Sequence, residues 1–275
     1  MKIVNDIVKG YLNGESLSTY KNQWYFHSSS VPKDQGRNVF TDFESSEENK
    51  KKVSLVQEAI LEVTKDFKPL NQPIWDALFP NWREVLKNEE IDLILGFPEP
   101  YDAMTEYDDK GTCHIIFDLG CWSKYVGQCN IQEVVLNLLT HELCHVLISK
   151  TMAGIDEALQ ASDYHTVLDA LTFHEGFAHL ISYNAKEITD IDWQDEKLRE
   201  VRQQSIQEMQ KALVVEDSKE QKDYLYRAQC GNNYYDKYAC MCGLLYLAEV
   251  WEQGGIPALK ECFLQGWHGF AEKCL

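Results

Sequence analysis

Residues 131–151 carry apolar side chains at helical spacing, and His141, Glu142 and His145 lie in the middle of this stretch. Residues 138–147 read L-L-T-H-E-L-C-H-V-L, so apolar residues stand on both sides of the ionisable group. Burying two imidazoles and a carboxylate in such a helix is costly unless another group compensates for the lost water. A bound metal ion supplies that compensation. The sequence therefore predicts a metal site on this helix.

The spacing of the three ionisable residues fits a catalytic zinc site. Residues four apart lie on one face of a helix, so His141 and His145 can bind one Zn²⁺ ion while Glu142 stands beside the open coordination position. In this H-E-x-x-H pattern the glutamate is the general base that activates a water molecule. The structural alternative is a helix whose His and Glu side chains merely face water. The apolar neighbours cover too much of the helix for that.

A third ligand is expected on a following helix, because a catalytic zinc usually has three protein ligands and an open position. Residues 172–180 read T-F-H-E-G-F-A-H-L. H-E-x-x-H followed by a glutamate on a later helix resembles the gluzincin metallopeptidases, and E-G-F-A at 175–178 is similar to the third-ligand helix of the aminopeptidase N family. This resemblance implies that Glu175 is the third ligand. Gly176 and Ala178 are small, which would let two helices approach closely enough to reach one ion.

The chain departs from aminopeptidase N between these motifs, with 29 residues from His145 to Glu175, more than is usual in that family. It is more similar to small predicted bacterial zinc-dependent proteases that combine H-E-x-x-H with a later E-G-x-A. Peptide deformylase also joins H-E-x-x-H to a cysteine, and G-C-W-S at 120–123 is similar to its motif. Cys121 is too close to His141 in the sequence for that enzyme, and no glycine-rich substrate motif precedes it.

Six of the eight histidines fall between positions 114 and 179, so other ligand sets are open. His179 lies one turn beyond Glu175 and could be a ligand, a hydrogen-bond partner of a ligand, or a substrate contact. The sequence favours the hydrogen-bond partner or the cleft wall. His174 points about 100° away from Glu175 on an ideal helix, which favours a packing or surface role. His165 and His114 are expected to have only structural roles, His165 at the start of a helix and His114 on a strand.

The predicted mechanism is hydrolysis by a zinc-activated water, with Glu142 passing the proton of that water to the leaving amine. Gluzincins resemble one another in using a Tyr or His from a later segment to stabilise the tetrahedral oxygen. Tyr234, Tyr235 and Tyr238 are the candidates, in G-N-N-Y-Y-D-K-Y at the start of a helix. We select Tyr235, whose alternative role is packing on the core.

The expected substrate is a peptide or protein. The strand predicted at 114–119, just before the zinc helix, is the candidate for pairing with an extended peptide, which suits an endopeptidase. Aminopeptidase N members hold the substrate's amino terminus with a G-A-M-E-N loop. D-A-M-T-E at 102–106 has only a passing likeness, because its Glu is displaced and the preceding Gly is absent. Exopeptidase action is therefore unsupported.

The fold class expected is α+β and predominantly α: a zincin-like domain with a small N-terminal sheet packed on the H-E-x-x-H helix and a helical C-terminal half. We expect one domain over 1–275, with N-terminal helices and sheet at 1–128 and the helical part at 129–275. Periodicity predicts strands at 91–97 and 114–119, separated by a loop at 98–111. It predicts helices at 51–67, 75–86 (broken at Pro80), 131–151, 164–186, 193–228, 233–253 and 256–265.

Composition narrows the partners and the compartment. The formal net charge is −18, so the average field repels nucleic acid and anionic membrane surfaces. The first ten residues lack an apolar signal segment, and no stretch has the roughly 18 consecutive apolar residues of a membrane span. Nine cysteines without a C-x-x-C pair fit free thiols, and we expect a cytoplasmic protein. The sequence leaves the oligomeric state open.

A rival interpretation from another class is a binding or regulatory protein that retains a zinc site without turnover. Glu142 argues against it, since a purely structural site needs the two histidines and not the general base.

Overall fold

A computed structural model describes residues 1–27, 33–34, 37–38, 40–98, 102–108, 110, 112–231 and 233–275. Contacts among these residues divide the chain into two compact units. Unit 1 comprises Met1–Pro69 and Arg83–Val146, and unit 2 comprises Leu70–Trp82 and Leu147–Leu275. The chain therefore passes between the units at three points, and the last of them falls inside the H-E-x-x-H helix. The single domain over 1–275 stays a prediction.

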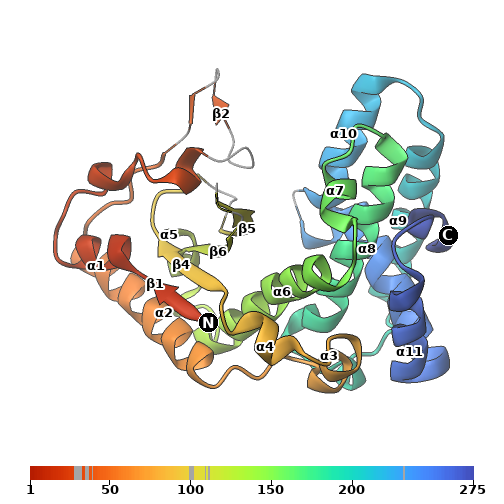
Figure 1. Cartoon of the computed structure of the whole chain (residues 1–275), viewed down its shortest axis with the longest axis horizontal. Helices are drawn as coiled ribbons and strands as arrows, with labels where there is room; N and C mark the ends of the chain where they lie inside the picture. The colour runs from red at the N-terminus through yellow and green to blue at the C-terminus, as the bar shows by residue number, and fades with distance from the viewer. Residues whose placement is uncertain are drawn as a thin grey trace. The chain divides into compact units, whose positions relative to one another are not determined.

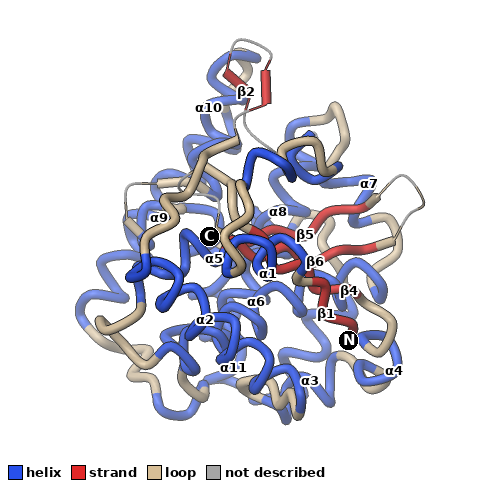
Figure 2. Tube along the Cα trace, turned by 90° about the vertical axis from the view of Figure 1, so that its left-hand side faces the viewer, coloured by secondary structure: helices blue, strands red, loops and turns tan. Residues whose placement is uncertain are grey.

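Unit 1 contains a four-stranded mixed sheet in the order β1-β4-β6-β5, whose strands are labelled in Figure 1 and drawn red in Figure 2. The strands are β1 Lys2–Val4, β4 Glu90–Ile94, β5 Ala103–Tyr107 and β6 Cys113–Asp118. β4 pairs in parallel with β1 and β6, whereas β5 pairs antiparallel with β6. The strands predicted at 91–97 and 114–119 are present as β4 and β6, although β4 ends at Ile94, three residues earlier than predicted. The loop predicted at 98–111 is wrong in part, because it contains β5, although residues 99–101, 109 and 111 lie outside the described part.

In unit 1 the helix predicted at 51–67 is present as α2 Glu47–Lys65, which begins four residues earlier than predicted. Ser46 caps α2, its hydroxyl accepting the Asn49 N–H at 3.2 Å, and the buried Val53, Val56 and Ile60 repeat at helical spacing. The other helices with residues in this unit are α1 Asp6–Leu12, α4 Trp82–Leu86, α5 Leu119–Trp122 and α6 Ile131–Thr151, together with short 3₁₀ helices at Leu17–Tyr20, Trp24–His27 and Ser123–Tyr125. A two-stranded sheet pairs β2 Lys33–Asp34 with β3 Arg37–Asn38.

Among the described residues of unit 2, every regular element is a helix. Its α-helices are α3 Gln72–Leu78, α7 Ile155–Leu159, α8 Tyr164–Ser182, α9 Glu196–Val214, α10 Ser218–Gln229, α11 Tyr238–Gln265 and α12 Phe270–Lys273, and its 3₁₀ helices are η4 Tyr183–Ala185, η5 Ile188–Asp190 and η6 Tyr234–Asp236. The single helix predicted over 193–228 is wrong. Asp217 accepts the Lys219 and Glu220 N–H groups and starts α10 as a separate helix.

An aromatic cluster fills the core of unit 2. Phe173 and Phe177 on α8 contact Phe263 on α11, with ring centroids 5.6 and 5.2 Å apart, and both contact Phe270 on α12. Phe79, which follows α3, packs against the same Phe263 ring at 5.3 Å. This contact explains why the short segment Leu70–Trp82 belongs to unit 2 although it lies between two parts of unit 1 in the sequence.

The described chain is mostly helical with one small mixed sheet of four strands, which confirms the predominantly helical α+β class. One described helix, α6, is long and apolar enough to cross a membrane by length and composition alone. Core helices of water-soluble proteins meet the same criteria, and 56% of the tested α6 window is buried inside the structure.

Candidate metal-binding site

The predicted histidine pair lies on consecutive turns of α6, within unit 1. The Nε2 atoms of His141 and His145 are 3.0 Å apart, and the two rings are perpendicular. Zinc binds imidazole nitrogen at 2.0–2.1 Å, so two nitrogens on a tetrahedral ion lie roughly 3.3 Å apart. Two lone pairs at this separation repel each other unless a proton or a cation lies between them. The donor atoms and their spacing therefore fit a bound zinc ion.

Glu142 follows His141 on α6, and a residue of the sheet contacts its carboxylate. Its Oε2 atom accepts a hydrogen bond from Thr105 Oγ1 on β5 at 3.3 Å, and the Glu142 side chain is buried. Thr105 was not among the predicted site residues, because the sequence pattern of 98–111 indicated a loop. A detectable signal was present, since the polar turn at 108–111 directly precedes the apolar strand β6 and is typical of a hairpin. In the structure Asp108 accepts the Lys110 and Thr112 N–H groups in this turn.

The predicted third ligand lies on α8, within unit 2. Asp163 caps this helix by accepting the Thr166 N–H at 2.8 Å. Glu175 Oε2 lies 3.4 Å from Nε2 of His179, one turn later. His174, for which the helical angle favoured packing or surface, also has a ring nitrogen within 4.8 Å of a Glu175 carboxylate oxygen. Unit 2 thus presents a carboxylate flanked by two imidazoles, all of which could bind a metal ion.

The tyrosines before α11 take different partners. Tyr234 Oη lies 3.0 Å from His179 Nδ1, whereas Tyr235 Oη lies 3.0 Å from Tyr183 Oη. The ammonium of Lys197 sits over the Tyr235 ring, 5.7 Å from its centroid. Both tyrosines belong to η6, whose capping box joins Asn233 and Asp236. Selecting Tyr235 as the donor to the tetrahedral oxygen stays a prediction.

Gly176 has a packing role different from the one expected. A Cβ atom at this position would lie 2.8 Å from the Cα of Gly243 on α11, and a Cβ on Gly243 would clash with the Thr172 carbonyl oxygen. The glycine of E-G-F-A therefore permits α8 to touch α11 inside unit 2. Cys240 stands one turn before Gly243, and burial and the nearby Glu175 carboxylate raise the pKa of its thiol. Helix α11 thus supports the Glu175 turn of α8.

His114 belongs to a separate cluster in unit 1. Its Nδ1 atom lies 2.6 Å from Asp92 Oδ2 on the neighbouring strand, and its Nε2 atom lies 3.6 Å from Asp108 Oδ2. Burial raises the pKa of Asp92, against the opposing effect of the hydrogen bond with His114. The cross-strand register places the two residues on one face of the sheet, which accounts for their pairing.

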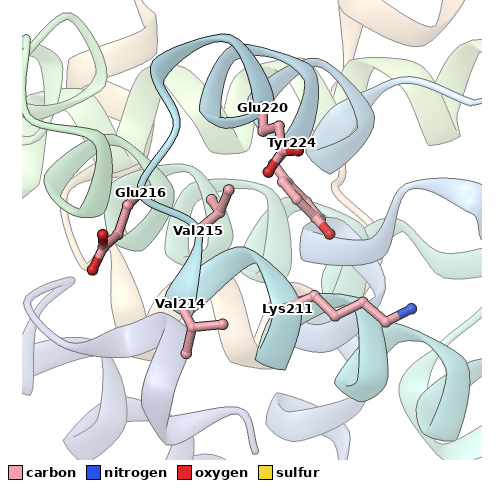
Figure 3. A pocket seen from close by; sticks show the side chains of 6 residues that line it. All are labelled: Lys211, Val214, Val215, Glu216, Glu220 and Tyr224. Carbon is pink, nitrogen blue, oxygen red and sulfur yellow. The ribbon is translucent and has the colours of Figure 1, made fainter.

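A shallow pocket of about 410 Å³ lies where α9 meets α10. Figure 3 shows the side chains that line it: Lys211, Val214, Val215, Glu216, Glu220 and Tyr224. It contains no histidine and none of the predicted site residues, so it is separate from the side chains described above.

This chain is in the class of proteins whose His and Glu side chains could bind a metal ion. The residues concerned are His141 and His145 in unit 1 and His174, Glu175 and His179 in unit 2. A family model described as "Putative zinc dependent peptidase (DUF5700)" matches residues 103–273. The match covers more than half of the 275 residues, and the chain therefore belongs to this family. It begins at the first residue of β5 and includes every predicted site residue. Comparisons with curated proteins and with solved structures gave no match.

Proposed function

We propose that this protein is a zinc-dependent peptidase of the gluzincin type, with a zincin-like fold, in which His141, His145 and Glu175 hold the metal ion. The observation that carries the proposal is the pair of Nε2 atoms 3.0 Å apart on α6, beside Glu142, in a chain whose family is described as "Putative zinc dependent peptidase". The role of Glu175 rests on the resemblance of E-G-F-A to a gluzincin third-ligand helix. It requires that the two units bring α6 and α8 to one ion.

The chemistry divides among a few side chains. When bound, zinc acts as a Lewis acid that polarises the scissile carbonyl and lowers the pKa of a water molecule. Glu142 accepts the proton of that water with its carboxylate and passes it to the leaving amine. The Thr105 hydroxyl donates a hydrogen bond to Oε2 of Glu142, which leaves the other carboxylate oxygen to face the water. Tyr235 donates a hydrogen bond to the tetrahedral oxygen, oriented by its contact with Tyr183.

The substrate is proposed to pair with β5. The earlier candidate, the strand at 114–119, is wrong for this purpose because β6 lies between β4 and β5 and both of its edges are occupied. Among the described residues β5 pairs only with β6, and Thr105 links it to Glu142. An extended peptide added beside β5 would present its backbone to the general base, which suits an endopeptidase. The proposed setting is cytoplasmic, and the net charge of −18 disfavours nucleic acid as a partner.

The test is zinc content together with peptide hydrolysis for the wild type and matched variants. We expect about one zinc ion per wild-type chain and marked loss in Glu175→Ala, whereas His165→Ala, an exposed position on the same helix, keeps its zinc. Glu142→Gln should retain zinc and lose about 10²–10⁴-fold in kcat. The control Glu133→Gln changes an exposed residue on the same α6 and should keep the wild-type kcat.

Two results would contradict the proposal. A wild type that stays free of zinc after dialysis against zinc would remove the metallopeptidase function altogether. The other result is a wild type that binds zinc but, like Glu142→Gln, hydrolyses no peptide in a library. That result would identify a binding or regulatory protein.

A further inference from the structure

A chain of polar contacts leads from η6 to Glu175 and lies wholly within unit 2. The Tyr234 hydroxyl contacts Nδ1 of His179 at 3.0 Å, and Nε2 of the same ring faces Glu175 Oε2 at 3.4 Å. The His179 side chain is only 6% exposed, so its ring nitrogens have little access to water. Tyr234 is the hydrogen-bond partner of Nδ1, and the Glu175 carboxylate is an ion-pair partner of Nε2.

The order of protons along this chain follows from the charge of Glu175. A neutral imidazole carries one proton, and a carboxylate only accepts hydrogen bonds. If the proton were on Nδ1, the Nε2 lone pair would face the carboxylate and repel it. The favoured arrangement therefore has Tyr234 Oη–H donating to Nδ1, with Nε2–H turned toward the Glu175 carboxylate.

From this geometry we infer that Tyr234 and His179 are positioning residues for Glu175. Tyr234 selects the His179 tautomer, and His179 fixes the rotamer of the Glu175 carboxylate by holding Oε2, which leaves Oε1 to bind the metal ion. The inference rests on the proposed function, because it gives Glu175 the role of a zinc ligand. Groups that orient a metal ligand typically change metal affinity 10–100-fold when they are removed.

The packing of the helices of unit 2 brings Tyr234 and Glu175, the two ends of this chain of contacts, to the same ring of His179. Close packing of Gly176 against Gly243 sets the separation of α8 and α11, and η6 directly precedes α11. Tyr234 therefore reaches the face of α8 that carries Glu175 and His179. Tyr235, the next residue, is directed to Tyr183 instead, so the two tyrosines are separable by mutation.

The experiment measures zinc affinity by competition with a chelator, in full-length chains prepared without metal. Tyr234→Phe removes one hydroxyl and should weaken zinc binding about 3–10-fold, and His179→Ala should weaken it about 10–100-fold. His179→Gln should restore part of the loss, because its amide can still donate to Glu175. Tyr226→Phe, at an exposed position on α10, is the matched control and should bind zinc as the wild type does.

Cobalt substitution separates positioning from ligation. If His179 only orients Glu175, the Co²⁺ absorption spectra of Tyr234→Phe and His179→Gln should match the wild type in intensity and shape. A spectrum that changes coordination in His179→Gln would identify His179 as a ligand and overturn the inference. Unchanged zinc affinity in Tyr234→Phe and His179→Gln would also overturn it while leaving the proposed function intact.

Failure of the proposed function has its own signature, since the wild type itself would then bind no zinc. Far-UV circular dichroism and the melting temperature of each metal-free chain show whether a variant is folded. If His179→Ala does not fold, Tyr234→Phe and His179→Gln decide the outcome.

Discussion

Asp118 accepts four backbone N–H groups with its two carboxylate oxygens. Oδ2 accepts from Gly96 and Phe97 at 2.7 Å each, and Oδ1 accepts from Gly120 and Cys121 at 2.8 and 3.1 Å. One side chain thereby caps α5 and fixes the segment that leaves β4. Burial raises its pKa from 3.8 to about 6, although the four N–H groups oppose the shift. Sequence reasoning assigned no role to this residue, because its partners come from two separate segments.

This pKa predicts how stability changes with pH. Between pH 3.8 and about 6 the folded chain binds a proton that the unfolded chain releases, so the contribution of Asp118 to stability falls as pH rises through this window. In Asp118→Asn that dependence should vanish. The difference in free energy of unfolding between wild type and variant, measured in urea at pH 4 and pH 7, should change by about 2 kcal/mol. A difference that stays constant with pH would show that the N–H groups keep the Asp118 pKa low.

At the scale of elements, the contact of α8 with α11 depends on the absence of two side chains. Gly176→Ala would set a Cβ 2.8 Å from Gly243 Cα, so the helices must move apart. We expect a loss of about 1–3 kcal/mol in free energy of unfolding. The sign is the test: without this contact, alanine would stabilise a helix by up to about 1 kcal/mol relative to glycine. Denaturant unfolding of Gly176→Ala that shows greater stability would contradict the packing described.

Most elements were predictable where the signal is local. The helix at 131–151 was placed correctly, because apolar spacing is local, and the break predicted between 253 and 256 coincides with Gly255, whose φ is +62°. The failures involve signals that a single segment does not contain. Strand β5 is half-buried only through pairing with β6, and its five residues alternate too weakly to be recognised alone. The division of α9 from α10 had a local signal, because Asp217 is a residue type that caps helices. The prediction of one continuous helix did not take this cap into account.

The candidate site shows the same division. The ligand spacing within H-E-x-x-H was readable, because positions i and i+4 share a helix face whatever the rest of the chain does. Thr105 was not, since it lies 37 residues from Glu142 and meets it through the sheet. The choice between Tyr234 and Tyr235 also depends on tertiary contacts, because adjacent residues at the start of a helix differ little in local signal.

For the whole molecule, the proposed zinc ligands come from both units. One ion held by His141, His145 and Glu175 should therefore stabilise unit 1 and unit 2 together. At a free zinc concentration 1,000 times Kd, we expect about 4 kcal/mol of added stability. Amide hydrogen exchange should slow in α2 of unit 1 and in α11 of unit 2 when zinc is added, and this effect should disappear with a chelator. Protection confined to α2 would contradict a site shared by both units.

The path of the chain has a consequence for its synthesis. Asn71, at the start of the segment Leu70–Trp82, completes its hydrogen bonds with the Ile181 carbonyl and the Ile188 N–H, the latter 117 residues further along. At roughly 5–20 residues per second, a ribosome needs on the order of 6–20 s to make the intervening chain. During that interval Trp75 and Phe79 have left the ribosome before α11 exists to pack against them. A nascent chain of this protein must therefore keep an aromatic segment in water, or on a chaperone, until most of its length has been made.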